Sequence, residues 1–484
     1  MMYGLNLDDG RLSLDILFTF FSKTQRRLSV QLKATVFGKT YQFGSIKEVL
    51  AKANEKKSGD ELLGLAASTA TERNAARYVL SELTLEDIRN HPVIPYDEDE
   101  VTRVIEDDLN TTIYNEIKNW TVGYLREWLL DHSTSCDDIR RVSRGLNSEM
   151  IAGVAKLMSN MDLVYGASKI RITSRAETEI GQKGTLSFRL QPNHPTDNWN
   201  GILATIMEGL SYGSGDAIIG INPAEDSVGS TRLLMQNSHD FIQKWDIPTQ
   251  NCVLSHITTQ MQAVREGAPV SVLFQSIAGS EDANESFGVT AALLDEAQDL
   301  IRQFGTAPGP NLLYFETGQG SEMAVGCEHG VDEMTLEART YGFGRHFAPF
   351  MVNNVSGFIG PETIYDGKQI IRANLEDHYM GKLHGLPMGM APCYTNHTYA
   401  DQNDQEIATM LLTMAGANYF MGVPMGDDVM LSYQDTGFHD DTTLRELMGL
   451  RPAPAFEAWL ECQGLMIDGR LTAKAGDASF FLHQ

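Results

Sequence analysis

Apolar residues in the first third of the chain recur at helical spacing. Residues 47–53 and 75–83 have apolar positions three or four residues apart, which predicts two amphipathic helices. Ser45 and Glu48 have the spacing of a capping box, so we expect a helix to begin there. The pattern predicts a mostly helical region over residues 30–158.

After Lys169 the pattern changes, because short runs rich in β-branched and aromatic residues alternate with stretches of helical length. This alternation is typical of parallel α/β folds. The stretches at 199–210, 231–245, 290–304 and 405–415 carry apolar stripes and are predicted to be helices. The runs predicted to be strands number eight: 187–192, 217–222, 252–257, 270–277, 312–317, 350–356, 391–396 and 417–423.

Eight strand–helix units predict an α/β fold of the TIM type, a (β/α)8 barrel. An open doubly wound sheet is the alternative, but such sheets usually have a glycine-rich turn after the first strand, and this chain has Gln191-Pro-Asn-His194 there. We therefore expect an N-terminal extension of unknown role (1–29), the helical region (30–158), the catalytic barrel (159–430) and a C-terminal helical extension (431–484).

Composition narrows the possible partners. A net charge of -26 argues against nucleic-acid binding, which needs clustered Lys and Arg. The apolar stretch at 14–21 is too short to cross a bilayer, so no membrane partner is expected. The five cysteines are scattered and form no CxxC pair, which indicates free thiols in a reducing, cytoplasmic compartment.

The active site of such a barrel forms at the carboxyl ends of its strands, where polar residues are the informative ones. Amides, one arginine and one carboxylate predominate, which indicates a site that binds a small polar molecule by hydrogen bonds. Metal sites need several converging carboxylates or histidines, so no metal is predicted, and His378 and His397 are interpreted as surface or hydrogen-bonded structural residues. The polar residues at the run ends are Arg189, Gln191, Asn222, His256, Gln275, Ser276, Glu316, Asn396 and His397.

Several segments along the chain resemble one known family, the large subunit of ethanolamine ammonia-lyase. The resemblance runs from about Val30 to the end of the chain and keeps the order and spacing of the segments. The segments are Ser187-Phe-Arg-Leu-Gln-Pro-Asn-His194, Gly209-Leu-Ser-Tyr-Gly213, Gly220-Ile-Asn-Pro223, Tyr314-Phe-Glu-Thr-Gly-Gln-Gly-Ser321, Gly357-Phe-Ile-Gly-Pro-Glu362, Leu375-Glu-Asp-His378 and Met425-Gly-Asp-Asp-Val-Met430.

The resemblance implies a radical carbon–nitrogen lyase that uses adenosylcobalamin to convert ethanolamine to acetaldehyde and ammonia. It implies that Arg189, Asn222 and Glu316 bind the substrate hydroxyl group, with Arg189 and Glu316 as the catalytic pair. Gln191 and Glu316 would bind the amino group. Charge-assisted hydrogen bonds of this kind are strong.

The resemblance also implies the surroundings of the site. Phe287, Phe358 and Met421 would form an apolar wall beside the substrate. A smaller partner subunit, and self-association of the large subunit into dimers and higher oligomers, are implied as well, and residence inside a bacterial microcompartment stays open. The residues that would contact the cofactor are Pro223, Gln275, Ser276, Val355 and Met430.

Two positions depart from the family pattern. Ala391 stands where the family has an Asp that helps to bind the amino group, and Ala324 stands where a small hydroxyl residue is expected near the cofactor. Three interpretations of Ala391 stay open: a different amino alcohol as substrate, compensation by a neighbour such as Cys393 or Asn396, or a paralogue with weakened activity. The first predicts that Ala391→Asp raises turnover of ethanolamine.

Two other classes of function compete with the radical lyase. One is a cofactor-independent barrel lyase or hydrolase with Glu316 as general base. The other is an inactive paralogue retained as a scaffold, against which the presence of Arg189, Gln191, Asn222 and Glu316 argues. A requirement of the activity for cobalamin separates the radical lyase from the cofactor-independent enzyme.

Overall fold

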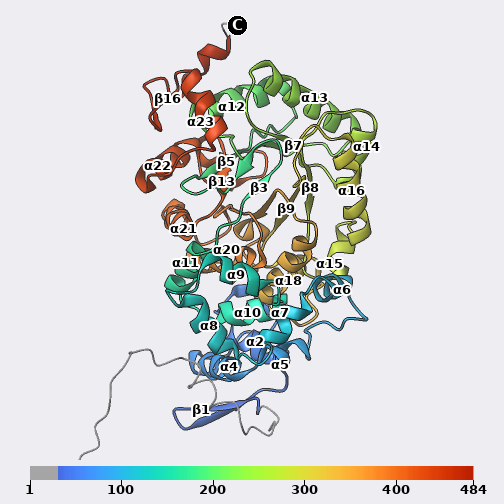
Figure 1. The fold of residues 1–484 in the computed structure, drawn as a ribbon, viewed down its shortest axis with the longest axis vertical. Coiled ribbons are helices and arrows are strands. Elements are labelled where there is room, and N and C mark those ends of the chain that lie inside the picture. The colour runs from blue at the N-terminus through green and yellow to red at the C-terminus, as the bar shows by residue number, and fades with distance from the viewer. Residues whose placement is uncertain (1–30, 483–484) are drawn as a thin grey trace, which may run out of the picture.

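The computed structural model describes residues 31–482, with the N-terminal helices at one end of an elongated molecule and the C-terminal elements at the other (Figure 1). The predicted extension over residues 1–29 lies outside the described residues.

The N-terminal region is a hairpin followed by helices, as the apolar spacing predicts. The hairpin consists of β1 (Lys33–Val36) and β2 (Lys39–Gln42). Ser45 caps α2, since its side chain accepts from the N–H of Glu48, but the Glu48 carboxylate accepts from Gly44 instead of closing a capping box. The helices are α2 (Ile46–Ala53), α3 (Ser58–Leu62), α4 (Ala70–Glu82), α5 (Leu85–Arg89), α6 (Glu100–Asp107), α7 (Thr111–Ile117), α8 (Val122–Leu130), α9 (Cys136–Ser143), α10 (Ser148–Lys156) and α11 (Asn160–Ser168).

Eight parallel strands form the barrel predicted from the sequence. The first and last strands of the barrel in chain order are neighbours, with Arg189 opposite Met421. The strands are short and almost entirely buried, as expected for a parallel sheet covered by helices. They are β5 (Ser187–Leu190), β6 (Ile218–Ile221), β7 (Asn251–Val253), β8 (Leu273–Ser276), β9 (Leu313–Thr317), β10 (Met351–Asn354), β11 (Met388–Met390) and β13 (Tyr419–Gly422).

Side chains, and not a backbone ladder, join β7 to β8. In the described part of the chain seven pairs of neighbouring strands have ladders, and β7 and β8 face each other across the remaining seam. The Asn251 amide oxygen accepts from the N–H and the hydroxyl of Ser271 (2.9 and 3.0 Å). The Gln260 amide accepts from the N–H of Phe274 (3.0 Å) and donates to its carbonyl (2.8 Å), as a neighbouring strand would.

Helices cover the outside of the barrel, and the four helices predicted from apolar stripes are confirmed with small shifts in their ends. A short hairpin, β3 (Ser174–Arg175) and β4 (Glu179–Ile180), precedes the first barrel strand. The helices are α12 (Trp199–Ser211), α13 (Val228–Lys244), α14 (Ile257–Arg265), α15 (Glu281–Ser286), α16 (Ala291–Phe304), α17 (Ser321–Val325), α18 (Glu333–His346), α19 (Ser356–Ile359), α20 (Gly367–His384) and α21 (Gln402–Ala415).

The prediction of the seventh strand was wrong. The strand is β11 at Met388–Met390 and not residues 391–396. The run Met388-Gly-Met has no β-branched residue, and Gly389 is required because the Tyr419 ring of β13 occupies the space of a Cβ there. Residues of the predicted run form β12 (Tyr394–Thr395), which belongs to a small antiparallel sheet above the barrel with β14 (Asp427–Asp428) and β15 (Tyr433–Gln434).

The C-terminal segment adds helices and one more hairpin to the barrel. A 3-10 turn η1 (Pro424–Gly426) precedes β14, and another, η2 (Ala478–Leu482), ends the described chain. No helix between residues 31 and 482 combines the length and apolarity needed to span a membrane. The remaining elements are α22 (Phe438–Met448), α23 (Pro454–Cys462), β16 (Met466–Ile467) and β17 (Arg470–Leu471).

A buried ion network joins the N-terminal helices to the barrel. Arg339 of α18 has no exposed surface and forms two ion pairs. One is with Asp99, the N-cap of α6 (2.6 Å), and the other is with Glu149 of α10 (2.7 Å). Its Nε also donates to the carbonyl of Gly279 (2.8 Å). Because buried charges are costly without partners, this guanidinium fixes how the two parts pack.

We predict that Arg339→Met lowers the free energy of unfolding by about 3–5 kcal/mol, since it leaves the buried carboxylates of Asp99 and Glu149 without their partner. Urea denaturation of the purified chain measures the change. Arg232→Met is the matched control, because Arg232 and Glu266 form an exposed pair (51% and 40% of the side-chain surface) that contributes about 0–1 kcal/mol. Equal losses in the two variants would contradict the assigned role of Arg339.

Candidate active site

The guanidinium of Arg189 lies inside the barrel at the carboxyl end of β5. The residue is 1% exposed, so its charge needs partners. One terminal nitrogen donates to Glu316 and to the Tyr314 hydroxyl (both 2.8 Å), and the other donates to the amide oxygen of Asn222 (2.7 Å). The structure therefore brings together Arg189, Asn222 and Glu316, three residues that the sequence predicted for one site.

Glu316 lies on β9 and is the carboxylate of this cluster. Its Oε1 accepts hydrogen bonds from Arg189, from Tyr314 and from the amide of Asn353 (3.2 Å). Burial raises the pKa of Tyr314 well above its ordinary value, so this phenol stays protonated and donates. Among the described residues no group donates to Oε2 of Glu316, whose side chain is 14% exposed, so this oxygen is available to a ligand.

Gln191 and Asn193 continue the first strand and are held by Asp428 of β14. The carboxylate of Asp428 accepts from the amides of Gln191 (2.6 Å) and Asn193 (2.7 Å), and Gln191 also reaches the Tyr433 hydroxyl (2.8 Å). Asn193 in turn accepts from the backbone N–H of Asn222 (2.8 Å). One carboxylate from outside the barrel thus orients the polar groups of two strands.

Five residues of this cluster were missed in the sequence: Asn193, Tyr314, Asn353, Asp428 and Tyr433. Alternation along the strands was an available signal for Asn193 and Tyr314. Asn193 lies two residues after Gln191 and Tyr314 two before Glu316, so each pair shares a face, while Asn353 lies within the predicted run 350–356. No comparable signal existed for Asp428 and Tyr433, which follow the last barrel strand.

The three predicted wall residues lie at different depths. Met421 of β13 is buried, and its sulfur is 3.4 Å from the Arg189 guanidinium. Phe358 of α19 is 38% exposed at the rim and packs edge-on against Tyr433 (ring centroids 5.2 Å apart). Phe287 ends α15, is half-buried, and accepts at its carbonyl from His256 (2.8 Å).

The five predicted cofactor contacts lie on segments at the carboxyl ends of the strands. Pro223 follows β6, and Val355 follows β10. Gln275 and Ser276 end β8, where the Gln275 amide oxygen already accepts from the N–H of Ile257 (3.0 Å) across the seam. Met430 follows β14, and its N–H donates to Asp428 (3.0 Å). These five residues therefore surround the same open end of the barrel.

The structure excludes a surface position for His378, agrees with one for His397, and places Asn396 outside the barrel strands. His378 is fully buried in α20, so the surface interpretation is wrong for it, and burial lowers the pKa of its ring far below the ordinary value. Asn396 and His397 are exposed in the turn after β12 and do not line the barrel end, because the seventh strand stops at Met390. Within residues 31–482 no group of three or more acidic, His or Cys residues is arranged to hold a metal.

Asp377, the residue before His378, anchors the loops that follow β9 and β10. Its carboxylate accepts from the side chains of Gln319, Asn354 and Ser356, each at 2.7 Å. Burial raises the pKa of Asp377 to about 7. The Leu375–His378 segment therefore supports the strand ends from behind.

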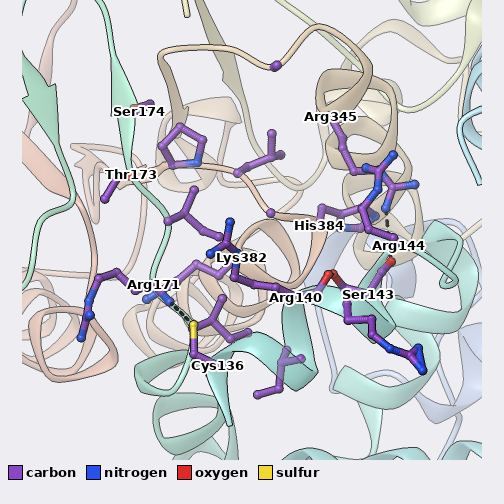
Figure 2. Close-up of a pocket in the computed structure, with 18 of the residues that line it drawn as sticks. Cys136, Arg140, Ser143, Arg144, Arg171, Thr173, Ser174, Arg345, Lys382 and His384 are labelled. Carbon is purple, nitrogen blue, oxygen red and sulfur yellow. Dashed lines mark hydrogen bonds between the residues drawn. The ribbon is translucent and has the colours of Figure 1, made fainter. Parts of the chain in front are cut away.

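A cavity of about 870 Å3 lies at the opposite end of the barrel and contains none of the predicted site residues (Figure 2). Arg345 and Lys382, from the last turns of α18 and α20, line it. Lys382 donates to the carbonyls of Ala415 (3.2 Å) and Gly416 (2.8 Å), and Arg345 pairs with Asp108 (2.9 Å). Both side chains lie near the carboxyl ends of helices, where cations are favourable, while burial lowers the pKa of Lys382 to about 7 and that of Arg345 to about 10.

Comparisons with known proteins agree with this architecture. Residues 41–474 match the family model described as ethanolamine ammonia lyase large subunit (EutB). The ethanolamine ammonia-lyase large subunits of Salmonella typhimurium and of Escherichia coli K12 are each 55% identical to this chain over 452 residues, which is 93% of this chain and 100% of each relative. The chain therefore belongs to the lyase family of ethanolamine ammonia-lyase large subunits.

Proposed function

We propose that this chain is the catalytic subunit of an adenosylcobalamin-dependent lyase that converts ethanolamine to acetaldehyde and ammonia. The observation that carries the proposal is the cluster of Arg189, Asn222 and Glu316 at the carboxyl ends of β5, β6 and β9, in a chain 55% identical to proteins of that name. A small molecule with a hydrogen-bond donor at each end, such as an amino alcohol, is complementary to the carboxylate and the amide oxygens of this cluster.

The substrate hydroxyl group binds beside the Arg189–Glu316 pair, where Oε2 of Glu316 accepts its proton in a hydrogen bond. Arg189, Tyr314 and Asn353 fix the Glu316 carboxylate before substrate arrives, so little reorganisation is needed on binding. Gln191, oriented by Asp428, faces the amino group.

The residues at the open end of the barrel fit a large, flat cofactor. Apolar side chains are exposed there, namely Phe358 (38%), Met425 (80%) and Val429 (66%), and such surfaces usually mark a binding face. Pro223, Gln275, Ser276, Val355 and Met430 would hold adenosylcobalamin against this rim. When bound, this cofactor supplies the radical that activates the substrate carbon, and the protein orients the substrate and excludes water.

The same open end is also where a small subunit would complete the cofactor site, because the exposed rim needs a cover. The family name, large subunit, supports such a partner. The same proposal includes self-association of the chain into dimers and higher oligomers. It also includes residence in the cytoplasm or in a bacterial microcompartment.

The first test is release of acetaldehyde and ammonia from ethanolamine by the chain coexpressed with its small subunit, in the dark, with and without adenosylcobalamin. We expect release only with the cofactor. Equal release without it would favour a cofactor-independent lyase with Glu316 as general base. An enzyme that binds cobalamin but releases nothing from any small amino alcohol would favour the inactive scaffold.

We predict that Glu316→Gln lowers kcat/KM for ethanolamine by about 10- to 100-fold, because a charge-assisted hydrogen bond to the substrate is lost. Steady-state kinetics of the holoenzyme measure the change. Glu296→Gln is the control, since Glu296 is 60% exposed and pairs with Arg265 on the surface. A Glu316→Gln enzyme with unchanged kcat/KM would exclude Glu316 from the substrate site.

A further inference from the structure

The strand end at Ala391 has no polar side chain to offer a substrate. Ala391 follows β11 directly and is fully buried. Its N–H donates to the carbonyl of Asn354 (2.9 Å), and its methyl group cannot accept a hydrogen bond. An amino group bound near this strand therefore lacks a carboxylate, unless another part of the fold provides one.

The two neighbours that the sequence offered as substitutes do not provide a carboxylate. Cys393 is fully buried, and burial together with the nearby Asp435 raises the pKa of its thiol well above the ordinary value, so the thiol stays neutral. Asn396 is exposed in the turn after β12 and carries an amide, not a carboxylate.

Asp435 comes from the small antiparallel sheet and lies across from Cys393. In the register of β12 and β15, Tyr394 pairs with Gln434 and Thr395 with Tyr433. Continued by one residue, this register sets Cys393 opposite Asp435. Residues two apart in an extended segment share a face, so Asp435 faces the same way as Tyr433. Tyr433 contacts Gln191 from that face (2.8 Å), which is the face toward the site.

The residue after Asp435 anchors this segment to the barrel. The Thr436 hydroxyl donates to the carbonyl of Met421, and the Thr436 carbonyl accepts from Val423 (3.1 Å). Met421 lies on β13, the strand that pairs with β11 immediately before Ala391. Asp435 is therefore held at the end of β13, the strand beside Ala391.

The carboxyl group of Asp435 is buried and only half satisfied. The residue is 3% exposed, its Oδ1 accepts from the N–H of Thr436 (2.8 Å), and its Oδ2 has no partner among the described residues. Burial raises its pKa to about 8; hydrogen bonds from Thr436 and the charge of Arg189 act in the opposite direction, and Asp428 adds to the increase. A buried acceptor without a partner is destabilising, and an arriving donor would satisfy it.

We propose that Asp435 is the carboxylate that binds the amino group of the substrate in this enzyme, in place of a side chain at position 391. The inference rests on the proposed function, and it narrows the substrate class to small alcohols that carry an ammonium group. The ammonium ion, placed between Gln191 and Asp435, becomes the missing partner of Oδ2 and keeps the carboxyl group ionised.

The test compares four variants of the complex with the small subunit: Asp435→Asn, Ala391→Asp, the double variant, and Asp427→Asn. Asp427 is an exposed carboxylate on β14 of the same small sheet and serves as the matched control. Kinetics with ethanolamine are measured on the holoenzyme. Calorimetry on complexes loaded with cyanocobalamin, which does not turn over, compares ethanolamine with ethylene glycol, a molecule of the same size without an amino group.

We expect Asp435→Asn to weaken ethanolamine binding by about 10- to 100-fold and to leave ethylene glycol binding nearly unchanged. Ala391→Asp alone is not expected to raise turnover, because two neighbouring carboxyl groups disfavour each other's ionisation. In the double variant the new carboxylate at position 391 replaces the lost one at position 435, so we expect KM to return to within about threefold of the parent value. The effects of the two substitutions are then not additive, as expected for residues in contact.

Three results would overturn the assignment of Asp435: an unchanged ethanolamine affinity in Asp435→Asn, an equal loss for both ligands, or a double variant no better than Asp435→Asn. Higher turnover by Ala391→Asp alone would instead support a different natural substrate. Failure of the proposed function is separate, since it would be seen as a parent holoenzyme that releases no acetaldehyde.

Discussion

A guanidinium ion buried at the centre of a barrel must be surrounded by acceptors, and the site of this protein depends on that requirement. β6 and β9 bring the acceptors Asn222 and Glu316 to the two terminal nitrogens of Arg189. Removing either acceptor would leave part of the buried Arg189 charge without a hydrogen-bond partner, which is costly. This cost favours the one arrangement of β5, β6 and β9 that satisfies the guanidinium. The side chains that we propose to bind the substrate are thereby ordered in advance by the stability of the fold itself.

The barrel and its central cluster could be predicted from the sequence because both follow local rules. Buried runs alternate with amphipathic helices, and polar residues stand where the runs end. The prediction failed at β11, where Met388-Gly-Met is a strand only because Tyr419 of the next strand fills the space beside Gly389. That contact joins residues 30 positions apart, and no local pattern encodes it.

The outer part of the site could not be predicted for a related reason. Asp428, Tyr433 and Asp435 follow the last barrel strand in a segment without periodicity, and only tertiary hydrogen bonds fold them back over the strand ends. Their spacing resembles that of an ordinary surface loop. The family resemblance showed that Ala391 replaces an Asp of the family. The side chain that we propose as its substitute, Asp435, could be found only from the strand register and from its buried oxygen without a hydrogen-bond partner.

The seam between β7 and β8 has a consequence for how the molecule behaves among its neighbours. A sheet that does not close by a backbone ladder has two edge strands, and unpaired edges are templates for association with other chains. Here the side-chain amide of Asn251 bonds the N–H of Ser271, and that of Gln260 bonds the N–H and carbonyl of Phe274. These main-chain groups are therefore not available to a strand from another chain. The barrel thus contains two sheet edges, and its own side chains occupy hydrogen-bonding groups on the β8 side of the seam.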